Sequence, residues 1–438
     1  YSQLVQQLLP GLTVSFVAIS LGAAFGVLSG RGALAGILSA GVIALITAAF
    51  GGTRIQCSGP TAPMTAVTIL LVSAVGGGLL ADHPDVDPDR FINLVLLLTG
   101  AMLIVASLLR LGRFIKLIPK IVISGFMNGI ALLIWVGEFR SIFGIGGKTA
   151  YLGNVFVNLA IVLLTLLVIF TLPLLLRKIS NRLNSFFPAT LIAIVVVSTL
   201  SNLFGLDVQH VSLGGSIESL TDIKGMIVGQ LPTEWSLTLL ILAAPFVVQL
   251  AMLAYLDTLL TSLVVDRKVE IMHGRQDPTK PNQELCAQGI ANAAVSVFGG
   301  IPGAQATIRS VLILNEGATM RLAGVLVGIF VLIEMLMFQD LISLIPQAVF
   351  SGVLLKVGYD VFDWMPVRQY ISQLLQPSPA QLPPVGHSGM ALIAGTALLT
   401  VLVNLSVAVI VFTIIFYLAR KFCGIEDIKT ESAMHDEG

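Results

Sequence analysis

The chain has 438 residues, of which 56% are hydrophobic and only 11% are charged, and its formal net charge is zero. Soluble domains carry about 25% charged residues, so this composition excludes an ordinary soluble protein and indicates a polytopic membrane protein. The neutral balance gives no electrostatic reason to expect a nucleic-acid partner, and the three scattered cysteines indicate neither a disulfide framework nor a zinc site.

Hydrophobic segments of bilayer-spanning length recur along the whole chain. A run of about 20 apolar residues crosses the hydrocarbon core as a helix. The first segment lacks the basic leader and cleavage site of a signal peptide, so we expect it to follow a cytoplasmic N-terminus. The predicted segments, in order, are 8–28, 33–49, 58–75, 91–109, 121–143, 155–176, 187–204, 236–265, 284–298, 306–315, 321–337, 341–358 and 389–418, the last of which is long enough to be two packed helices.

The linkers between the segments differ in charge. Lys and Arg are concentrated at 110–120, 177–182 and 266–280, whereas the loop at 81–90 is acidic and the loop at 206–235 is mixed. Cytoplasmic loops of membrane proteins carry the excess of basic residues. We therefore expect the basic linkers and both termini on the cytoplasmic side of the plasma (inner) membrane.

Two of the predicted segments are interrupted in a similar way. The sequences GGTRIQCSGPTAPM from Gly51 and GGIPGAQATIRSVL from Gly299 both open with Gly-Gly, continue irregularly and then enter a short apolar stretch. Irregular backbone at membrane depth survives only where protein or a water-filled cavity covers it, and paired interrupted segments point to the binding site of a transporter. We expect half-helices starting at Thr61 and Thr307, with N-termini that attract an anion. Two unrelated glycine-rich turns are the alternative.

Arg309 lies in the first turn of the second predicted half-helix. An arginine inside the membrane is costly unless it lines a cavity or has a partner. We interpret it as an anion-attracting group of the binding cavity, while a structural ion pair with Asp257 or Glu334 remains the alternative.

Asp257 and Thr261 are four residues apart and share one helical face. A carboxylate and a hydroxyl are oxygen ligands suited to a hard cation such as Na⁺. Asp257 could instead carry a proton, or only neutralise Arg309, and the sequence leaves these possibilities open. No arrangement of side chains resembles a catalytic triad or a phosphate-binding loop, so we do not expect an enzyme or a bound cofactor other than a coupling ion.

Five segments resemble motifs of the sulfate permease (SulP) family of anion transporters, in the same order. Several of them are most similar to the bicarbonate-transporting branch of that family. The resembling segments are 51–67, 119–132, 284–311, 345–364 and 399–409.

The resemblance implies an all-α polytopic membrane protein of UraA-like fold, with about 14 transmembrane segments in a seven-plus-seven inverted repeat. The first repeat would cover residues 1–204 and the second 236–424, joined by an extracellular connection at 205–235 and followed by a cytoplasmic tail at 425–438. It also implies core and gate domains, elevator-type alternating access and a homodimer.

Site residues are also implied by the resemblance. The anion is expected against Ala24, Phe25, Thr61, Ala62, Ala306, Thr307 and Arg309, and Na⁺ against Asp257, Thr261, Gln305, Ala306 and Thr307.

Two departures from the family pattern affect the prediction. The bicarbonate-transporting branch has an uncharged residue where this chain has Arg309, so sulfate, chloride or a dicarboxylate stays open. The family usually ends in a cytoplasmic STAS domain, and we expect none after the last segment, which fits either a naturally short member or a chain from which that domain was removed. The expected function is secondary active transport of bicarbonate or sulfate, coupled to sodium or protons. A passive anion channel or uncoupled exchanger is the alternative, and a nucleobase permease fits least.

Overall fold

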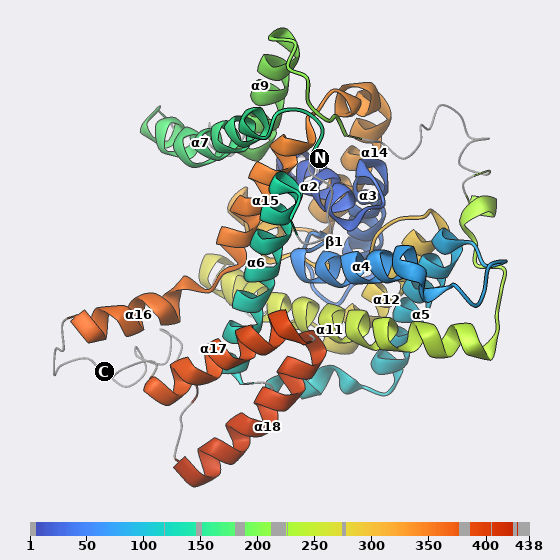
Figure 1. Ribbon diagram of the computed structural model, residues 1–438. Helices are drawn as coiled ribbons and strands as arrows, with labels where there is room; N and C mark the ends of the chain where they lie inside the picture. The colour runs from blue at the N-terminus through green and yellow to red at the C-terminus, as the bar shows by residue number, and fades with distance from the viewer. Residues whose placement is uncertain are drawn as a thin grey trace. The chain divides into compact units, whose positions relative to one another are not determined.

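The computed structural model describes residues 6–117, 119–145, 151–179, 189–211, 225, 227–273, 277–375, 386–403, 405–423 and 427, and it is built of helices with one small strand pair (Figure 1). The helices are α2 (Leu8–Ser29), α3 (Ala33–Phe50), α4 (Ala62–Ala74), the π-helix η1 (Val75–Leu79), α5 (Pro88–Leu108), the 3₁₀-helix η2 (Leu111–Leu117), α6 (Lys120–Phe143), α7 (Val155–Ile179), α9 (Ala189–Leu203), α11 (Leu237–His273), α12 (Pro281–Val297), α13 (Thr307–Asn315), α14 (Arg321–Ser343), α15 (Gln347–Val361), α16 (Trp364–Leu375), α17 (His387–Leu402) and α18 (Leu405–Cys423). The strands are β1 (Ser58–Pro60) and β2 (Gly303–Gln305).

Most predicted segments coincide with these helices, and the long last segment is indeed two helices, α17 and α18. The predicted start of the segment at 341–358 is wrong. Helix α14 continues to Ser343, and α15 begins only after Pro346, because a proline disfavours helical backbone in the residue before it. Helix α16 is not among the predicted segments, since it is more polar than a membrane span.

Among the described residues, eight helices are long and apolar enough to cross a membrane. Helices α9 and α17 are apolar but shorter, and α13 has only nine residues. A chain with this composition and these helices is a multi-pass membrane protein.

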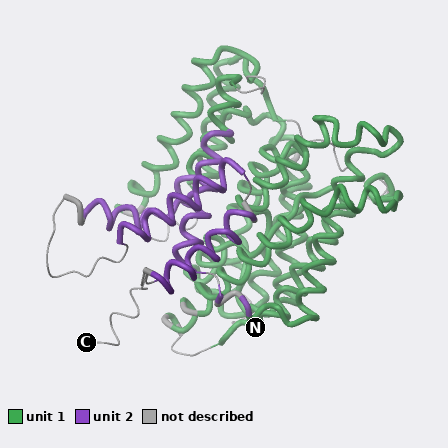
Figure 2. Tube along the Cα trace, turned by 60° about the horizontal axis from the view of Figure 1, so that its bottom comes forward, with its two compact units in different colours: residues 1–113, 138–356 green, residues 114–137, 357–438 purple. Residues whose placement is uncertain are grey.

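The chain divides into two compact units, which interleave along the sequence (Figure 2). Unit 1 comprises residues 1–113 and 138–356, and unit 2 comprises residues 114–137 and 357–438.

In unit 1, helices α2, α3 and α14 contact one another, and α12 lies against α3 and α5. Glycines make the closest of these approaches possible. A Cβ atom at Gly36 of α3 would collide with the backbone of Gly22 and Gly26 in α2. Small residues let helices inside a membrane approach until their backbones touch, so α2 and α3 form a rigid pair beside the strands.

In unit 2, the first part of α6 lies against α17, and α17 contacts α18. A Cβ atom at Gly125 would lie 2.6 Å from the carbonyl oxygen of Ile393. The backbone N–H of Asp363 donates to Oδ1 of Asn128 at 2.7 Å, which joins the segment before α16 to α6.

Candidate functional site

The two interrupted segments meet in an antiparallel strand pair. Ser58 is paired with Gln305, Gly59 with Ala304, and Pro60 with Gly303. All six residues are buried. A three-residue strand pair satisfies backbone groups that would otherwise be unpaired in the membrane interior.

A short helix begins directly after each strand. Helix α4 starts at Ala62, behind Thr61, and α13 starts at Thr307, as the sequence predicts. Neither helix has a side-chain cap at its N-terminus. The first N–H groups of a helix have no partner within the helix, so both starts present hydrogen-bond donors and a partial positive charge. Two such termini linked by one strand pair suit a small anion.

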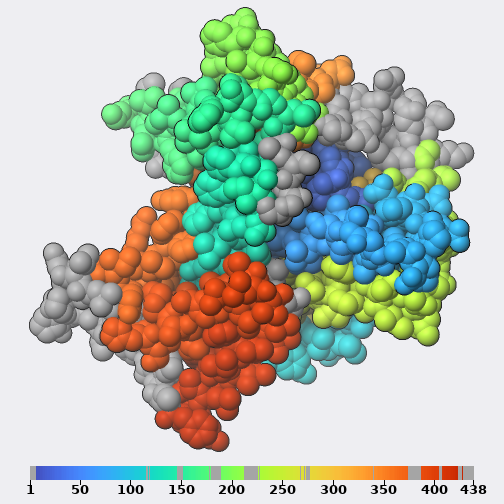
Figure 3. Space-filling model, in the orientation of Figure 1, coloured from blue at the N-terminus to red at the C-terminus, as the bar shows by residue number. Residues whose placement is uncertain are grey.

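Helices α2 and α11 border this arrangement. Helix α2 contacts β1, α4 and α13, and α11 contacts β2, α4 and α13. On one face of unit 1, α4 and α5 lie beside α11 (Figure 3). The predicted anion residues Ala24 and Phe25 belong to α2 and are buried, which places them on a helix that contacts both α4 and α13.

The two helix starts differ in accessibility. Thr61 and Ala62 are buried at the start of α4. At the start of α13, Thr307 is exposed and Ala306 is partly exposed. Ala306 and Thr307 can therefore be reached from outside the protein interior in this conformation.

Arg309 is almost completely buried, with 1% of its surface exposed. Its Nη2 atom donates a hydrogen bond of 2.8 Å to the carbonyl oxygen of Pro60, while Nε and Nη1 have no hydrogen-bond partner within the described part of the chain. A Cβ atom at Gly59 would lie 2.8 Å from Nη1, so glycine leaves the room that the guanidinium occupies. Arg309 thus joins α13 to the end of β1 and brings a full positive charge next to the starts of α4 and α13.

The ion pairs considered for Arg309 are not formed. Asp257 interacts electrostatically with Arg309, but no ion pair joins these two described residues. Glu334 accepts a hydrogen bond of 2.6 Å from the hydroxyl of Ser15 instead. A backbone carbonyl, which the sequence pattern does not reveal, is the partner of the guanidinium.

The predicted cation ligands lie on three elements that contact one another. The hydroxyl oxygens of Thr261 on α11 and Thr307 on α13 are 2.6 Å apart. The N–H of Gln305 on β2 donates to Oγ1 of Thr258 on α11 at 3.4 Å. Asp257 is half-buried, and its Oδ2 has no hydrogen-bond partner among the described residues.

No group of three or more His, Cys, Asp or Glu side chains that could hold a metal occurs among the residues that the structure describes. A cation at Asp257 would therefore depend on one carboxylate together with hydroxyl and carbonyl oxygens. Such a set suits a hard alkali cation better than a transition metal.

Sequence reasoning missed the polar face of α12. Glu284, Gln288 and Asn292 are buried and four residues apart. Glu284 accepts hydrogen bonds from the N–H of Thr53 at 2.9 Å and from Nε2 of Gln56 at 2.8 Å.

The other two side chains of this face bind the strands themselves. Gln288 donates to the hydroxyl of Ser58 at 2.7 Å, and Asn292 bonds both the N–H and the C=O of Gly303 at 2.9 Å. The four-residue spacing of polar side chains on an otherwise apolar helix is a signal that could have identified this face.

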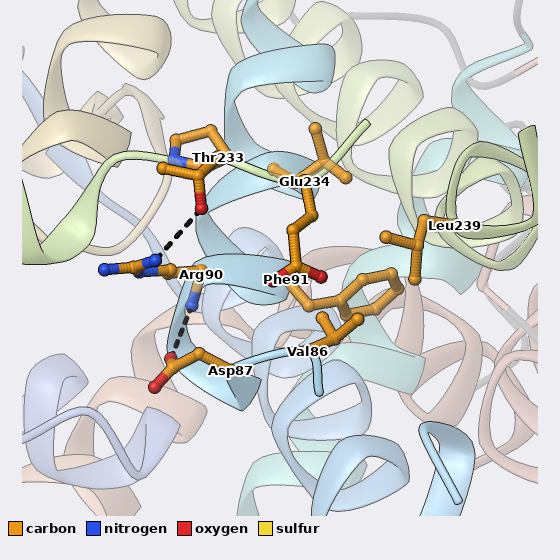
Figure 4. Close-up of a pocket in the computed structure, with 9 residues that line it drawn as sticks. Val86, Asp87, Arg90, Phe91, Thr233, Glu234 and Leu239 are labelled. Carbon is orange, nitrogen blue, oxygen red and sulfur yellow. Dashed lines mark hydrogen bonds between the residues drawn. The ribbon is translucent and has the colours of Figure 1, made fainter. Parts of the chain in front are cut away.

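A shallow depression at the start of α5 has a structural role and is not a binding site (Figure 4). Asp87 caps α5 by accepting from the N–H of Arg90 at 3.0 Å, and Nη1 of Arg90 donates to Thr233 at 2.9 Å. The space has a volume of about 10 Å³, enough for roughly one water molecule. Its polar groups fasten the segment before α11 to α5 rather than hold a ligand.

The chain matches known proteins over most of its length. Residues 4–374 match the model of the Sulfate permease family. The bicarbonate transporter BicA of Picosynechococcus sp. is 30% identical over 414 residues, which are 91% of this chain and 67% of the relative. BicA of Synechocystis sp. is 32% identical over 384 residues, covering 83% of this chain and 62% of the relative.

A solved structure also resembles this chain. The transmembrane domain of a cyanobacterial bicarbonate transporter BicA superimposes with a TM-score of 0.74 at 29% identity, covering 92% of this chain and 97% of that domain. The fold is therefore that of a transporter's transmembrane domain, and the chain is not an enzyme.

Proposed function

The chain belongs to the sulfate permease family of anion transporters, and on that basis we propose that it is a secondary active transporter for a small inorganic anion, bicarbonate or sulfate. The observation that carries this proposal is the pair of uncapped helix starts held together by β1 and β2. Donors from two helices around one point can hold an oxyanion of either kind. The anion would lie against Ala24, Phe25, Thr61, Ala62, Ala306 and Thr307, in the field of Arg309.

Coupling to Na⁺ or H⁺ is the second part of the proposal. It is supported by the unpartnered carboxylate oxygen of Asp257 and by the hydroxyls of Thr261 and Thr307, which lie within hydrogen-bonding distance. A cation held there would sit beside the start of α13 and favour anion binding at the same place. Gln305 and Ala306 would supply the remaining oxygen ligands.

The proposal extends to the movement that transport requires. We propose an inverted repeat of residues 1–204 and 236–424, each contributing one half-helix to the site, in a homodimer with both termini in the cytoplasm. The antiparallel pairing of β1 with β2 supports a two-fold relation between the repeats. Elevator-type alternating access would carry the bound anion across the membrane.

Uptake into proteoliposomes tests the proposal. Purified protein is assayed with radiolabelled bicarbonate, sulfate and a dicarboxylate, with and without a sodium or proton gradient. We expect saturable uptake of bicarbonate or sulfate that one of the gradients accelerates. Uptake of none of the three anions above protein-free liposomes would overturn the assignment.

The variant Asp257→Asn separates coupled transport from a passive channel. We expect this neutral side chain to remove the acceleration by the cation gradient, because the carboxylate charge that attracts the cation is lost. Thr258→Ser, which keeps the hydroxyl that accepts from Gln305, is the matched control and should stay coupled. An Asp257→Asn protein with full gradient-driven uptake would exclude this residue from coupling, whereas electrically measured anion conductance in both proteins would support the channel.

A further inference from the structure

A cavity separate from the anion site lies within unit 1, between α2, α9, α14 and the start of α15. Its volume is about 340 Å³, within the range of pockets that bind small organic molecules. Apolar side chains make up most of its lining, including Phe16, Ile194, Phe338 and Phe350. An apolar space of this size in a membrane protein favours an apolar occupant.

One carboxyl group lies in this apolar lining. Glu334 on α14 has 6% of its surface exposed and lines the cavity. Its Oε1 accepts the hydrogen bond from Ser15, but its Oε2 has no hydrogen-bond partner among the described residues. Ser198, on the facing helix α9, also lines the cavity, and its hydroxyl is likewise buried without a partner in the described chain.

Unpartnered buried polar atoms are costly, and an unpaired charge is more so. Oε2 of Glu334 is covered by protein atoms, so its side chain must rotate to bring this oxygen to the cavity. A ligand that then brings a hydrogen-bond donor with a positive charge to Oε2 would remove this cost, and its apolar body would cover the aromatic lining. We propose that the cavity is a binding site for a hydrophobic ammonium ion, an apolar molecule with one primary or secondary amine.

The access to the cavity agrees with such a ligand. Six of the lining residues are exposed, so the cavity is open on at least one side; they are Val195, Thr199, Asn202, Phe338, Leu341 and Leu344. Amphiphilic amines dissolve in bilayers, and they could enter through this side from the lipid.

The cavity is connected to the anion site through one helix. Ala23 lines the cavity and precedes Ala24, which belongs to the proposed anion site on the same helix α2. Since α2 contacts β1, α4 and α13, a bound ammonium ion would restrain the helix against which the anion binds. We therefore expect inhibition of uptake that lowers the maximal rate without competing with the anion.

The test measures ligand binding directly, by thermal unfolding of the purified full chain in detergent. The probes are n-octylamine and its uncharged counterpart 1-octanol. We expect the amine to bind at least about tenfold more tightly than the alcohol, because a charge-assisted hydrogen bond is added. In Glu334→Gln, which can still accept from Ser15, this preference should disappear.

Blocking variants show whether the ligand occupies this space. Val195→Trp at the exposed edge and Leu191→Trp in the lining should weaken binding of both probes at least about tenfold, by occupying the volume. Leu163→Trp, an exposed position on α7 outside the cavity, is the matched control and should bind as the wild type does. Equal amine binding in wild type and Glu334→Gln, or equal binding in Val195→Trp and Leu163→Trp, would overturn the proposal.

Discussion

Arg309 shows how one residue can serve both the architecture and the electrostatics of the site. Its hydrogen bond to Pro60 joins segments 249 positions apart in the chain. The same guanidinium lies next to two uncapped helix starts, so its charge adds to their partial charges. Because the residue is buried, water screens this charge less than it would at a surface.

Replacing Arg309 with alanine should therefore weaken anion binding. We expect KM for the transported anion to rise about 5- to 30-fold in Arg309→Ala, which corresponds to about 1–2 kcal/mol. The measurement is concentration-dependent uptake into proteoliposomes, on protein whose folding has been checked by thermal unfolding.

Arg309→Lys is the matched control, since it keeps the charge and can still donate to a carbonyl. Its KM should stay closer to the wild-type value. A folded Arg309→Ala protein with unchanged KM would show that the guanidinium contributes to the fold and not to anion binding.

At the scale of elements, the strand pair and the polar face of α12 act together. Each strand is too short to be stable alone, and Asn292 and Gln288 supply side-chain hydrogen bonds to both of them. Glu284 in turn holds the loop at Thr53 and Gln56. Helix α12 therefore holds in place the two strands that lead into α4 and α13, although it contributes no predicted anion or cation ligand.

Gly303 should be the most sensitive position in this arrangement. A Cβ atom there would collide with the backbone of Gly59 across the strand pair. We expect Gly303→Ala to destabilise the protein by about 1–3 kcal/mol, as overpacking does in a core, and to reduce uptake at least about tenfold.

Gly76→Ala provides the comparison, because no atom lies within 4 Å of the added Cβ at that position. Thermal unfolding and uptake should remain near the wild-type values in this variant. If Gly303→Ala also transports normally, the close contact of the strands is not required for function.

At the scale of the whole molecule, transport requires that the site open to each side of the membrane in turn. The conformation described here has Thr307 exposed at the start of α13, whereas Ser310, three residues later, is buried. The exposure of the start of α13 should change as the site opens to one side of the membrane and then to the other, so it can be used to follow the transport cycle.

Cysteine labelling can follow that cycle. In a variant with Cys57, Cys286 and Cys423 replaced, we expect Thr307→Cys to react with a membrane-impermeant thiol reagent from either side, and saturating anion to slow both reactions. Ser310→Cys, which is buried, should react much more slowly. Labelling of Thr307→Cys from one side only, under every ion gradient, would contradict alternating access.

Much of this molecule follows from local properties of the chain. Hydrophobic runs predicted the helical membrane protein, because burying apolar side chains in lipid depends on each segment alone. The glycine- and proline-rich interruptions predicted the two short helices to within a residue at Thr61 and Thr307. The coupling ion and the transported anion stay predictions, since side chains that bind several small oxyanions look alike in sequence.

The sequence by itself determined the class of protein, the positions of most helices and the presence of an arginine at a half-helix start. Only the tertiary structure decided that β1 pairs with β2, that Arg309 bonds the carbonyl of Pro60 and that α12 holds both strands. It alone also placed Glu334 in an apolar cavity. The physical reason is that a hydrophobic pattern depends only on whether each segment lies in lipid or in water. The contacts named above join residues up to hundreds of positions apart, and many of them use backbone atoms that every residue possesses.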